Sequence, residues 1–318
     1  MPVAAQTPRI KPRALRPGDT VGIVAPASSF KRDEFEPGCE ALREMGYKPV
    51  FSESIFDHDL YFAGSAERRA RELEEMFERE DVKAILCARG GYGANYLLPL
   101  VDLKKLAAAP KIFVGYSDIT SLLTHFCDAG SFVGFHGPMV AKDFAKPDGV
   151  DVGSWHNALS GAEGWRLEFG GGSGVKCLVA GSAEGILYGG CLSMLVASLG
   201  SPYEIETEGT ILFIEDVATK PYQIDRMLMH LKLARKLNDV RGIIFGEMLD
   251  CIQGQDQRYT LEEVVMRVVG DLGIPIAYGV RSGHVSRQNI TLPIGVRSAL
   301  NVQSSSVALE MLETATTI

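Results

Sequence analysis

The first half of the chain alternates short apolar runs with segments of helical character, and this rhythm restricts the possible folds more than any other feature. The apolar runs are of strand length, and charged or amphipathic stretches follow them. The runs cover Thr20–Ala25, Lys48–Phe51, Val82–Cys87 and Lys111–Val114, and the helical stretches cover Asp33–Met45, Ser65–Glu80 and Ile119–Asp128. Such alternation predicts a parallel sheet with helices on both faces.

A glycine-rich segment, residues 161–174, interrupts this rhythm and has little capacity for regular structure. We therefore expect an N-terminal α/β domain over residues 1–160, a linker over residues 161–174 and a second α/β domain over residues 175–318. The length of 318 residues agrees with two domains. The second domain is expected to be richer in strands, which are predicted at Gly185–Tyr188, Thr210–Glu215, Val240–Phe245, Ile290–Leu292 and Val307–Met311, with helices at Leu192–Leu199, Pro221–Leu233 and Leu261–Leu272.

Composition excludes several classes of function. The net charge of −8, from 32 basic and 40 acidic residues, disfavours nucleic acid or an anionic membrane as the main partner. No apolar run reaches the ~20 residues that span a bilayer, and the N-terminus lacks a signal-peptide core. The six cysteines are scattered without a Cys-x-x-Cys pair, which favours a reducing cytoplasm. No histidine or acidic cluster has metal-ligand spacing, so we expect neither a metal nor a cofactor.

Polar residues follow three of the predicted strands of the first domain. Ser28, Arg89 and Ser117 each come shortly after an apolar run. In open parallel sheets, ligands bind beyond the carboxyl ends of the strands. We therefore expect these three residues to lie along one edge of the first domain.

Ser117 stands at the tip of a tight turn between an apolar strand and a helix. This arrangement resembles the nucleophile elbow of hydrolases, which exposes the serine hydroxyl and directs helix N–H groups toward it. Gly115 matches the motif two residues before the serine, whereas Ile119 stands where the motif has a second glycine. A serine that caps the helix would have the same surroundings, so both roles remain open.

A serine nucleophile needs a base and an acid that orients the base. Among the six histidines, His136 and His284 both follow predicted strands and are candidates for the base. Glu215 ends an apolar strand, where a charge is costly without a partner. It could hold a histidine, cap the helix near Pro221 or pair with Arg226.

Two glycine-containing segments add further candidates. Residues 89–93 (Arg-Gly-Gly-Tyr-Gly) form neither a Walker loop nor a full dinucleotide motif, but such a loop can direct N–H groups at an anion. One of these N–H groups could build an oxyanion hole with that of Asp118, or the loop could be a simple turn. Cys191 follows two glycines at a helix start, so a cysteine hydrolase or amidotransferase remains an alternative.

Taken together and in order, several segments resemble one family, the LD-carboxypeptidases (muramoyltetrapeptide carboxypeptidases), which also contains the microcin-immunity peptidases. The matching segments are Leu15–Ser28, Ala88–Gly93, Val114–Thr120, His136–Met139, Gly189–Ser193, Phe213–Asp216, Pro221–Leu228 and Gly283–His284. The resemblance implies an N-terminal parallel-sheet domain similar to class I glutamine amidotransferases and a C-terminal swivelling β/β/α domain.

The resemblance also implies the site and its chemistry. It places a serine–glutamate–histidine triad on Ser117, Glu215 and His284, and the oxyanion donors on the backbone N–H groups of Gly91 and Asp118. The implied reaction is hydrolysis of the amide between an L-centre, L-lysine or meso-diaminopimelate, and the terminal D-alanine of a murein tetrapeptide, in peptidoglycan recycling.

The substrate of that reaction ends in a carboxylate, for which Arg89 is the expected cation. The resemblance suggests a homodimer. Two other functions remain open: a microcin-immunity-type hydrolase of aminoacyl-nucleotide amides, and a non-enzymatic two-domain binding protein. The first would call for an aromatic clamp on the base, and Trp155 and Trp165 are the tryptophans of the chain.

Overall fold

The structure is a computed structural model that describes residues 9–254 and 256–318. Over these residues the chain forms two compact units. The N-terminal unit consists of residues 9–162, 287–295 and 314–318, and the C-terminal unit of residues 163–254, 256–286 and 296–313. The chain therefore leaves the N-terminal unit after its first half and returns to it twice.

The described part of the N-terminal unit holds a six-stranded sheet in the order β12-β5-β4-β3-β1-β2. Its strands are β1 (Thr20–Val24), β2 (Lys48–Val50), β3 (Val82–Cys87), β4 (Ile112–Gly115), β5 (Gly134–His136) and β12 (Leu292–Ile294). The first five pair in parallel, and β12 pairs antiparallel with β5. The central strands are almost entirely buried, as parallel strands covered by helices should be. The predicted α/β fold with a parallel N-terminal sheet is confirmed.

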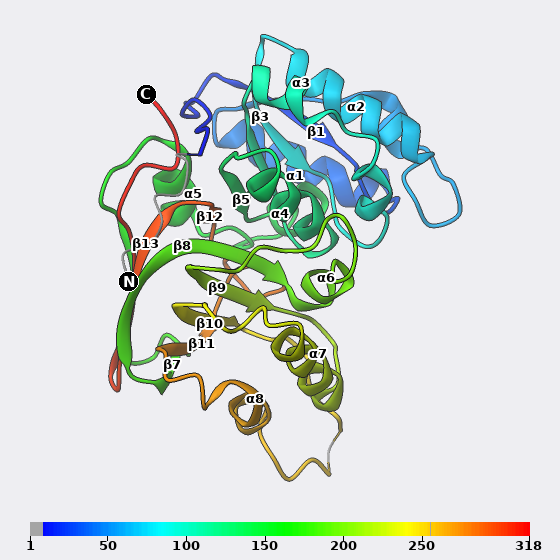
Figure 1. The fold of residues 1–318 in the computed structure, drawn as a ribbon. Coiled ribbons are helices and arrows are strands. Elements are labelled where there is room, and N and C mark those ends of the chain that lie inside the picture. The colour runs from blue at the N-terminus through cyan, green and yellow to red at the C-terminus, as the bar shows by residue number, and fades with distance from the viewer. Residues whose placement is uncertain (1–8, 255) are drawn as a thin grey trace. The chain divides into compact units, whose positions relative to one another are not determined.

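Helices connect these strands (Figure 1). They are α1 (Arg32–Glu44), α2 (Ala66–Glu78), α3 (Leu103–Ala108), α4 (Thr120–Asp128) and α5 (Val152–Leu159). Short helical turns lie at η1 (Glu53–Phe56), η2 (Ala94–Leu97), η3 (Ser117–Ile119) and η4 (Val140–Phe144). Helix α2 begins after Ser65, whose side chain accepts a hydrogen bond from the Arg68 N–H at 3.3 Å. A serine oxygen at this position satisfies a helix N–H that has no acceptor inside the helix.

The C-terminal unit contains, in its described part, an eight-stranded sheet in the order β6-β14-β13-β8-β9-β10-β11-β7. Its strands are β6 (Arg166–Phe169), β7 (Lys176–Val179), β8 (Gly181–Cys191), β9 (Thr210–Glu215), β10 (Gly242–Gly246), β11 (Ile276–Val280), β13 (Arg297–Gln303) and β14 (Ser306–Met311). Strands β8 to β11 run parallel, and the flanking strands pair antiparallel. The helices are α6 (Leu192–Ala197), α7 (Pro221–Leu233) and α8 (Leu261–Val269), and Figure 1 shows α7 and α8 beside this sheet.

Two segments differ from the expected organisation. Residues 161–174, expected to be a linker, contain β6, which pairs antiparallel with β14. In β6, apolar Leu167 and Phe169 alternate with charged residues, a pattern that fits an edge strand. The strand expected at Ile290–Leu292 is β12, and it joins the sheet of the N-terminal unit rather than the second sheet. Pairing between distant segments decides this membership, and three residues of apolar sequence cannot reveal it.

In the part of the chain that the structure describes, none of the helices combines the length and the apolar character needed to cross a membrane.

Helix α1 packs so closely against η4 that Gly38 has no room for a side chain. A β-carbon at this position would lie 2.1 Å from the Val140 carbonyl oxygen in η4, so that backbone would have to move. We expect Gly38→Ala to lower the free energy of unfolding by about 1–3 kcal/mol, measured by urea denaturation. Gly153→Ala in α5 is the control, because its nearest neighbour would be the Asp151 Oδ1 atom at an ordinary 3.6 Å. An equal loss in both variants would contradict this account.

Candidate active site

Ser117 lies at the strained tip of the turn between β4 and α4. It is the first residue of η3, and its φ angle is +64°. A side-chain-bearing residue in this left-handed region costs about 1–2 kcal/mol, so the surrounding structure must hold it there. The cap position before η3 belongs to Tyr116. The geometry therefore favours the nucleophile elbow over a capping serine.

The glycine-rich loop packs directly against Ser117. A β-carbon at Gly90 would lie 2.8 Å from the Ser117 Cβ atom and 3.1 Å from its Oγ atom. The absence of a side chain at Gly90 is what permits this approach. The Ser28 N–H also donates to the Gly90 carbonyl oxygen, at 3.2 Å. The structure thus brings the loops after β1, β3 and β4 together at one edge of the sheet.

Two backbone N–H groups beside these contacts donate to no acceptor in the part of the chain that the structure describes. Gly91 is exposed, has a φ of +106° and, within residues 9–254 and 256–318, donates to no other residue. The Asp118 N–H lies in the first turn of η3, where helices have no internal acceptor. The Tyr92 N–H is different, because it donates to the Ser28 Oγ atom at 3.0 Å. Unpaired N–H groups of this kind can stabilise an oxyanion.

The Asp118 side chain is buried beneath the turn, a feature that sequence reasoning missed. Its exposed fraction is 1%, and its Oδ2 atom accepts a hydrogen bond from the Ala94 N–H at 2.7 Å. Burial raises the pKa of this carboxyl group to about 6, against the hydrogen bond from Ala94 and the positive charge of Arg69. The carboxylate connects the residue after the candidate nucleophile to the glycine-rich loop.

In the C-terminal unit, Glu215 and His284 form a close pair. Glu215 is the last residue of β9 and is fully buried. Its Oε2 atom accepts a hydrogen bond from the backbone N–H of His284 at 3.0 Å and lies 2.7 Å from the Nδ1 atom of the ring. A proton on Nδ1 makes Nε2 the basic nitrogen of the neutral ring. Of the partners that the sequence left open for Glu215, the structure shows the histidine.

Gly246 provides the space for this pair. It ends β10, the strand next to β9, and a β-carbon there would lie 2.6 Å from the Glu215 Cβ atom. A larger residue would displace Glu215 or the neighbouring backbone. Gly246 carries no recognisable motif in the sequence, and only the pairing of the two strands shows its role.

The expected carboxylate-binding residue, Arg89, follows β3 and is partly exposed. Its Nη1 atom donates to the Ser29 carbonyl oxygen at 3.4 Å and lies 3.9 Å from a Glu34 carboxylate oxygen. An exposed ion pair at this distance is weak, so little free energy is lost when it breaks.

Two competing candidates lie in unsuitable surroundings. Cys191 is buried, and burial together with the charges of Glu215 and Asp216 raises the pKa of its thiol well above the usual value. This is the opposite of what a thiolate nucleophile needs. His136 ends β5 and is fully buried within the sheet, opposite Gly115 of β4. His284, by contrast, is partly accessible.

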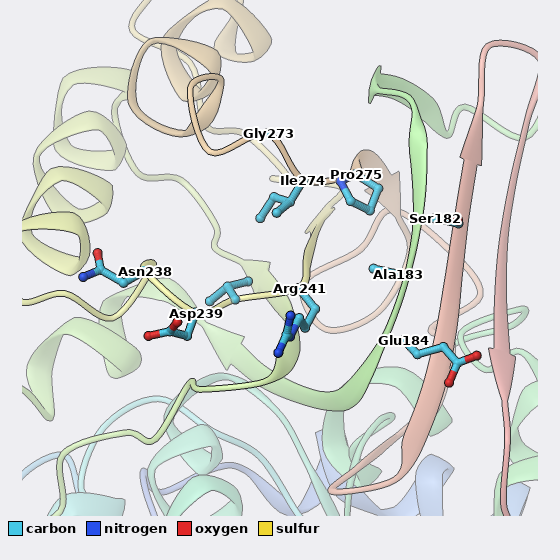
Figure 2. Close-up of a pocket in the computed structure, with 10 residues that line it drawn as sticks. Ser182, Ala183, Glu184, Asn238, Asp239, Arg241, Gly273, Ile274 and Pro275 are labelled. Atoms are coloured by element: carbon cyan, nitrogen blue, oxygen red, sulfur yellow. The ribbon is translucent and has the colours of Figure 1, made fainter. Parts of the chain in front are cut away.

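A cavity of about 510 Å³ lies elsewhere in the C-terminal unit. Figure 2 shows its lining, which comes from residues 182–184, 238–241 and 273–275. These residues stand near the amino ends of β8, β10 and β11, whereas Glu215 stands at the carboxyl end of β9. The cavity is therefore separate from the candidate site. In the described residues, no cluster of three or more His, Cys, Asp or Glu side chains could hold a metal.

The class that the fold and these residues favour is a two-domain α/β hydrolase of the serine type. Family models agree with this class. One described as LD-carboxypeptidase N-terminal domain matches residues 21–137, and one described as LD-carboxypeptidase C-terminal domain matches residues 184–300.

Curated and solved relatives span almost the whole chain. The probable murein peptide carboxypeptidase of Bacillus subtilis is 38% identical over 94% of each chain. The crystal structure of muramoyltetrapeptide carboxypeptidase from Oxalobacter formigenes has a TM-score of 0.83 at 27% identity, over 93% of this chain and 99% of that one. A structure of MccF in complex with glutamyl sulfamoyl guanosine has a TM-score of 0.88 at 26% identity, over 96% and 99%.

The chain therefore belongs to the LD-carboxypeptidase family. The predicted family and the predicted serine-type carboxypeptidase activity are confirmed by these matches.

The strain at Ser117 can be measured with two variants that both lack the hydroxyl. Glycine adopts a φ of +64° freely, whereas alanine does not. We therefore expect the free energy of unfolding of Ser117→Gly to be about 1 kcal/mol larger than that of Ser117→Ala. The same pair at exposed Ser304, whose φ is not in the left-handed region, should show the opposite order. Equal stabilities of the two Ser117 variants in chemical denaturation would argue against a strained turn.

Proposed function

We propose that this LD-carboxypeptidase hydrolyses the amide between L-lysine or meso-diaminopimelate and the terminal D-alanine of murein tetrapeptide, in peptidoglycan recycling. Ser117 acts as the nucleophile, His284 as the base and Glu215 as the residue that orients the base. The observation that carries the proposal is the hydrogen-bonded pair of Glu215 and His284. The name of the Bacillus subtilis relative, a probable murein peptide carboxypeptidase, supports this substrate class.

In the proposed mechanism, the Ser117 hydroxyl attacks the carbonyl carbon while the Nε2 atom of His284 takes its proton. The buried carboxylate of Glu215 keeps the other ring proton on Nδ1 and stabilises the positive ring. The N–H groups of Gly91 and Asp118 hold the tetrahedral oxyanion, and each such donor contributes about 3–4 kcal/mol. His284 then returns its proton to the amine of the departing D-alanine, and water releases the acyl group from Ser117.

Arg89 is our proposed partner for the terminal carboxylate of the substrate. It follows the same strand as the glycine-rich loop, and its weak pairing with Glu34 can be exchanged for a stronger charge-assisted bond. We further propose that the enzyme is a cytoplasmic homodimer that binds no nucleic acid. The scattered free cysteines support the cytoplasm, and the net charge of −8 opposes nucleic acid binding.

A second candidate function is hydrolysis of aminoacyl-nucleotide amides by the same triad. The similarity to MccF bound to glutamyl sulfamoyl guanosine favours it. Stacking on a nucleobase would need an accessible tryptophan, and the burial of both tryptophans does not favour this second function. Trp155 is 1% exposed and donates its ring N–H to the Tyr47 hydroxyl at 3.3 Å, and Trp165 is also buried. We therefore place murein peptide first.

The Ser117→Ala variant tests the nucleophile and the substrate together. Wild-type protein should release D-alanine from murein tetrapeptide, and Ser117→Ala should release none, because the attacking oxygen is missing. Liquid chromatography of the products measures this release, and exposed Ser304→Ala is the matched control. Equal release by wild type and Ser117→Ala would refute the nucleophile. Cleavage of an aminoacyl sulfamoyl-adenylate without D-alanine release would select the second function.

A second substitution tests the orienting acid. In Glu215→Gln, the side-chain amide can donate to Nδ1 and so place the ring proton on Nε2, where the base must be unprotonated. We expect kcat to fall by about 10³–10⁴ with little change in KM. Exposed Glu208→Gln, in the loop before β9, should keep full activity. A Glu215→Gln enzyme with near wild-type kcat would remove Glu215 from the mechanism.

A further inference from the structure

We propose that Arg69 and Asp118 are positioning residues, which clamp the Gly93–Ala94 peptide from its two sides and thereby hold the Gly91 N–H beside Ser117. The proposal rests on the proposed function, because it assumes that the Gly91 N–H receives the oxyanion. All of these residues belong to the N-terminal unit.

Arg69 is a buried arginine that ties three loops together. It projects from α2 with an exposed fraction of 1%. Its Nη1 atom donates to the Gly93 carbonyl oxygen at 2.8 Å and also to the Pro26 carbonyl oxygen, and its Nε atom donates to the Gly64 carbonyl oxygen at 3.1 Å. These acceptors lie in the loop after β1, the loop before α2 and the loop after β3. Only an arginine offers several donors in one rigid plane.

Asp118 holds the other side of the same peptide. Its Oδ2 atom accepts from the Ala94 N–H at 2.7 Å, while Arg69 binds the Gly93 carbonyl oxygen. The carbonyl and the N–H of a trans peptide point in opposite directions, so the two side chains approach from opposite sides. The charges match the peptide dipole, since the cation meets the oxygen and the anion meets the N–H. Charge-assisted hydrogen bonds in a buried place are stronger than neutral ones.

The clamp supplies a rigidity that the loop itself lacks. Glycines at positions 90, 91 and 93 give the backbone wide conformational freedom, and Gly93 has a φ of +126°. Ser28 ties the loop at Gly90 and Tyr92, and the clamp ties it at the Gly93–Ala94 peptide. Gly91 lies between these fixed points. Asp118 directly follows Ser117 in the chain. Its hydrogen bond with the Ala94 N–H therefore links the glycine-rich loop to the turn that carries Ser117.

The energetics show that the structure bears a cost for this arrangement. Burial raises the pKa of Asp118 to about 6, so the buried carboxylate is held at a disadvantage relative to water. The Arg69 guanidinium carbon lies 5.0 Å from the centre of the Phe62 ring, which partly replaces its lost hydration. Apolar residues of similar volume often replace buried charged groups without loss of stability, so stability alone does not require charged side chains at these two positions.

The experiment compares two neighbouring arginines of α2. Arg69→Met removes the clamp, whereas Arg68→Met removes the bonds of Arg68 to Glu72 and to the Ala63 carbonyl oxygen, which leave the Gly93–Ala94 peptide untouched. Both side chains are largely buried, so both variants lose stability. We expect kcat for D-alanine release to fall about 100-fold in Arg69→Met with KM within about threefold, and to stay within about threefold in Arg68→Met.

A transition-state readout separates positioning from general damage. A tripeptide ending in an α-aminoboronic acid forms a tetrahedral adduct with the serine oxygen, whereas the planar carboxylate of the product tripeptide depends much less on the oxyanion donors. Arg69→Met should bind the boronic acid about 100-fold more weakly, and its affinity for the product tripeptide should stay within about threefold of wild type. Asp118→Leu should behave like Arg69→Met, and Asp118→Asn, which keeps an acceptor for the Ala94 N–H, should recover most of the activity. The Asp118 variants decide the question if Arg69→Met does not fold.

The outcomes are distinct. An inactive Ser117→Ala enzyme together with an Arg69→Met enzyme as active as Arg68→Met would overturn the clamp and leave the proposed function intact. Equal loss of affinity for the boronic acid and the product tripeptide would also overturn it, because general damage weakens both. Full activity of Ser117→Ala would overturn the proposed function and the clamp with it. Selective loss of boronic acid affinity in Arg69→Met and Asp118→Leu supports the clamp.

Discussion

The carboxylate of Glu215 is buried completely at the end of a parallel strand, and His284 and Gly246 are positioned around it. A buried charge without a partner destabilises a protein by several kcal/mol. His284 contacts this carboxylate through its backbone N–H and through the Nδ1 atom of its ring. Gly246 leaves the space that the Glu215 side chain needs. The requirement for pairing therefore holds the His284 ring in place, and a carboxylate at this position favours a proton on Nδ1. In the proposed mechanism, the bonds that stabilise the buried carboxylate are also the bonds that orient the base.

The N-terminal unit meets a related constraint in a different way. Three strand ends deliver Ser28, the glycine-rich loop and Ser117 to one edge, where the approach is so close that Gly90 has no room for a side chain. Glycine allows the approach but leaves the backbone free to move. Buried polar groups restore the order that glycine removes, with Arg69 holding carbonyl groups and Asp118 holding an N–H. In the proposed clamp, the position of the candidate oxyanion donor at Gly91 depends on these charged hydrogen bonds.

Much of the fold could be predicted because its central strands are buried on both faces. Such strands consist of continuous apolar runs, as in Val82–Cys87 and Thr210–Glu215, and their ends agree with the structure. Other strands were harder to predict. The edge strand β6 and the inner strand β13 alternate more exposed with more buried residues, and β12 is three residues long. Their membership of a sheet depends on partners far away in the chain, which local pattern does not encode.

The candidate site divides in the same way. Glycines, a serine at a turn and a carboxylate at a strand end are local signals that made Ser117 and Glu215 candidates. The resemblance of the ordered segments to the LD-carboxypeptidase family implied the triad of Ser117, Glu215 and His284. Arg69 was hidden, because it lies on the buried face of α2 among charged neighbours and looks like one more surface cation.

By itself, the sequence determined several of the buried central strands, the turns and the residue types that chemistry needs, since these depend on near neighbours. Only the tertiary structure showed that Glu215 contacts His284 and that Gly246 leaves room for the Glu215 side chain. It also showed that Arg69 is buried. Those relations are contacts between residues far apart in the chain. Their energies come from burial and hydrogen-bond geometry, which exist only once the chain has folded.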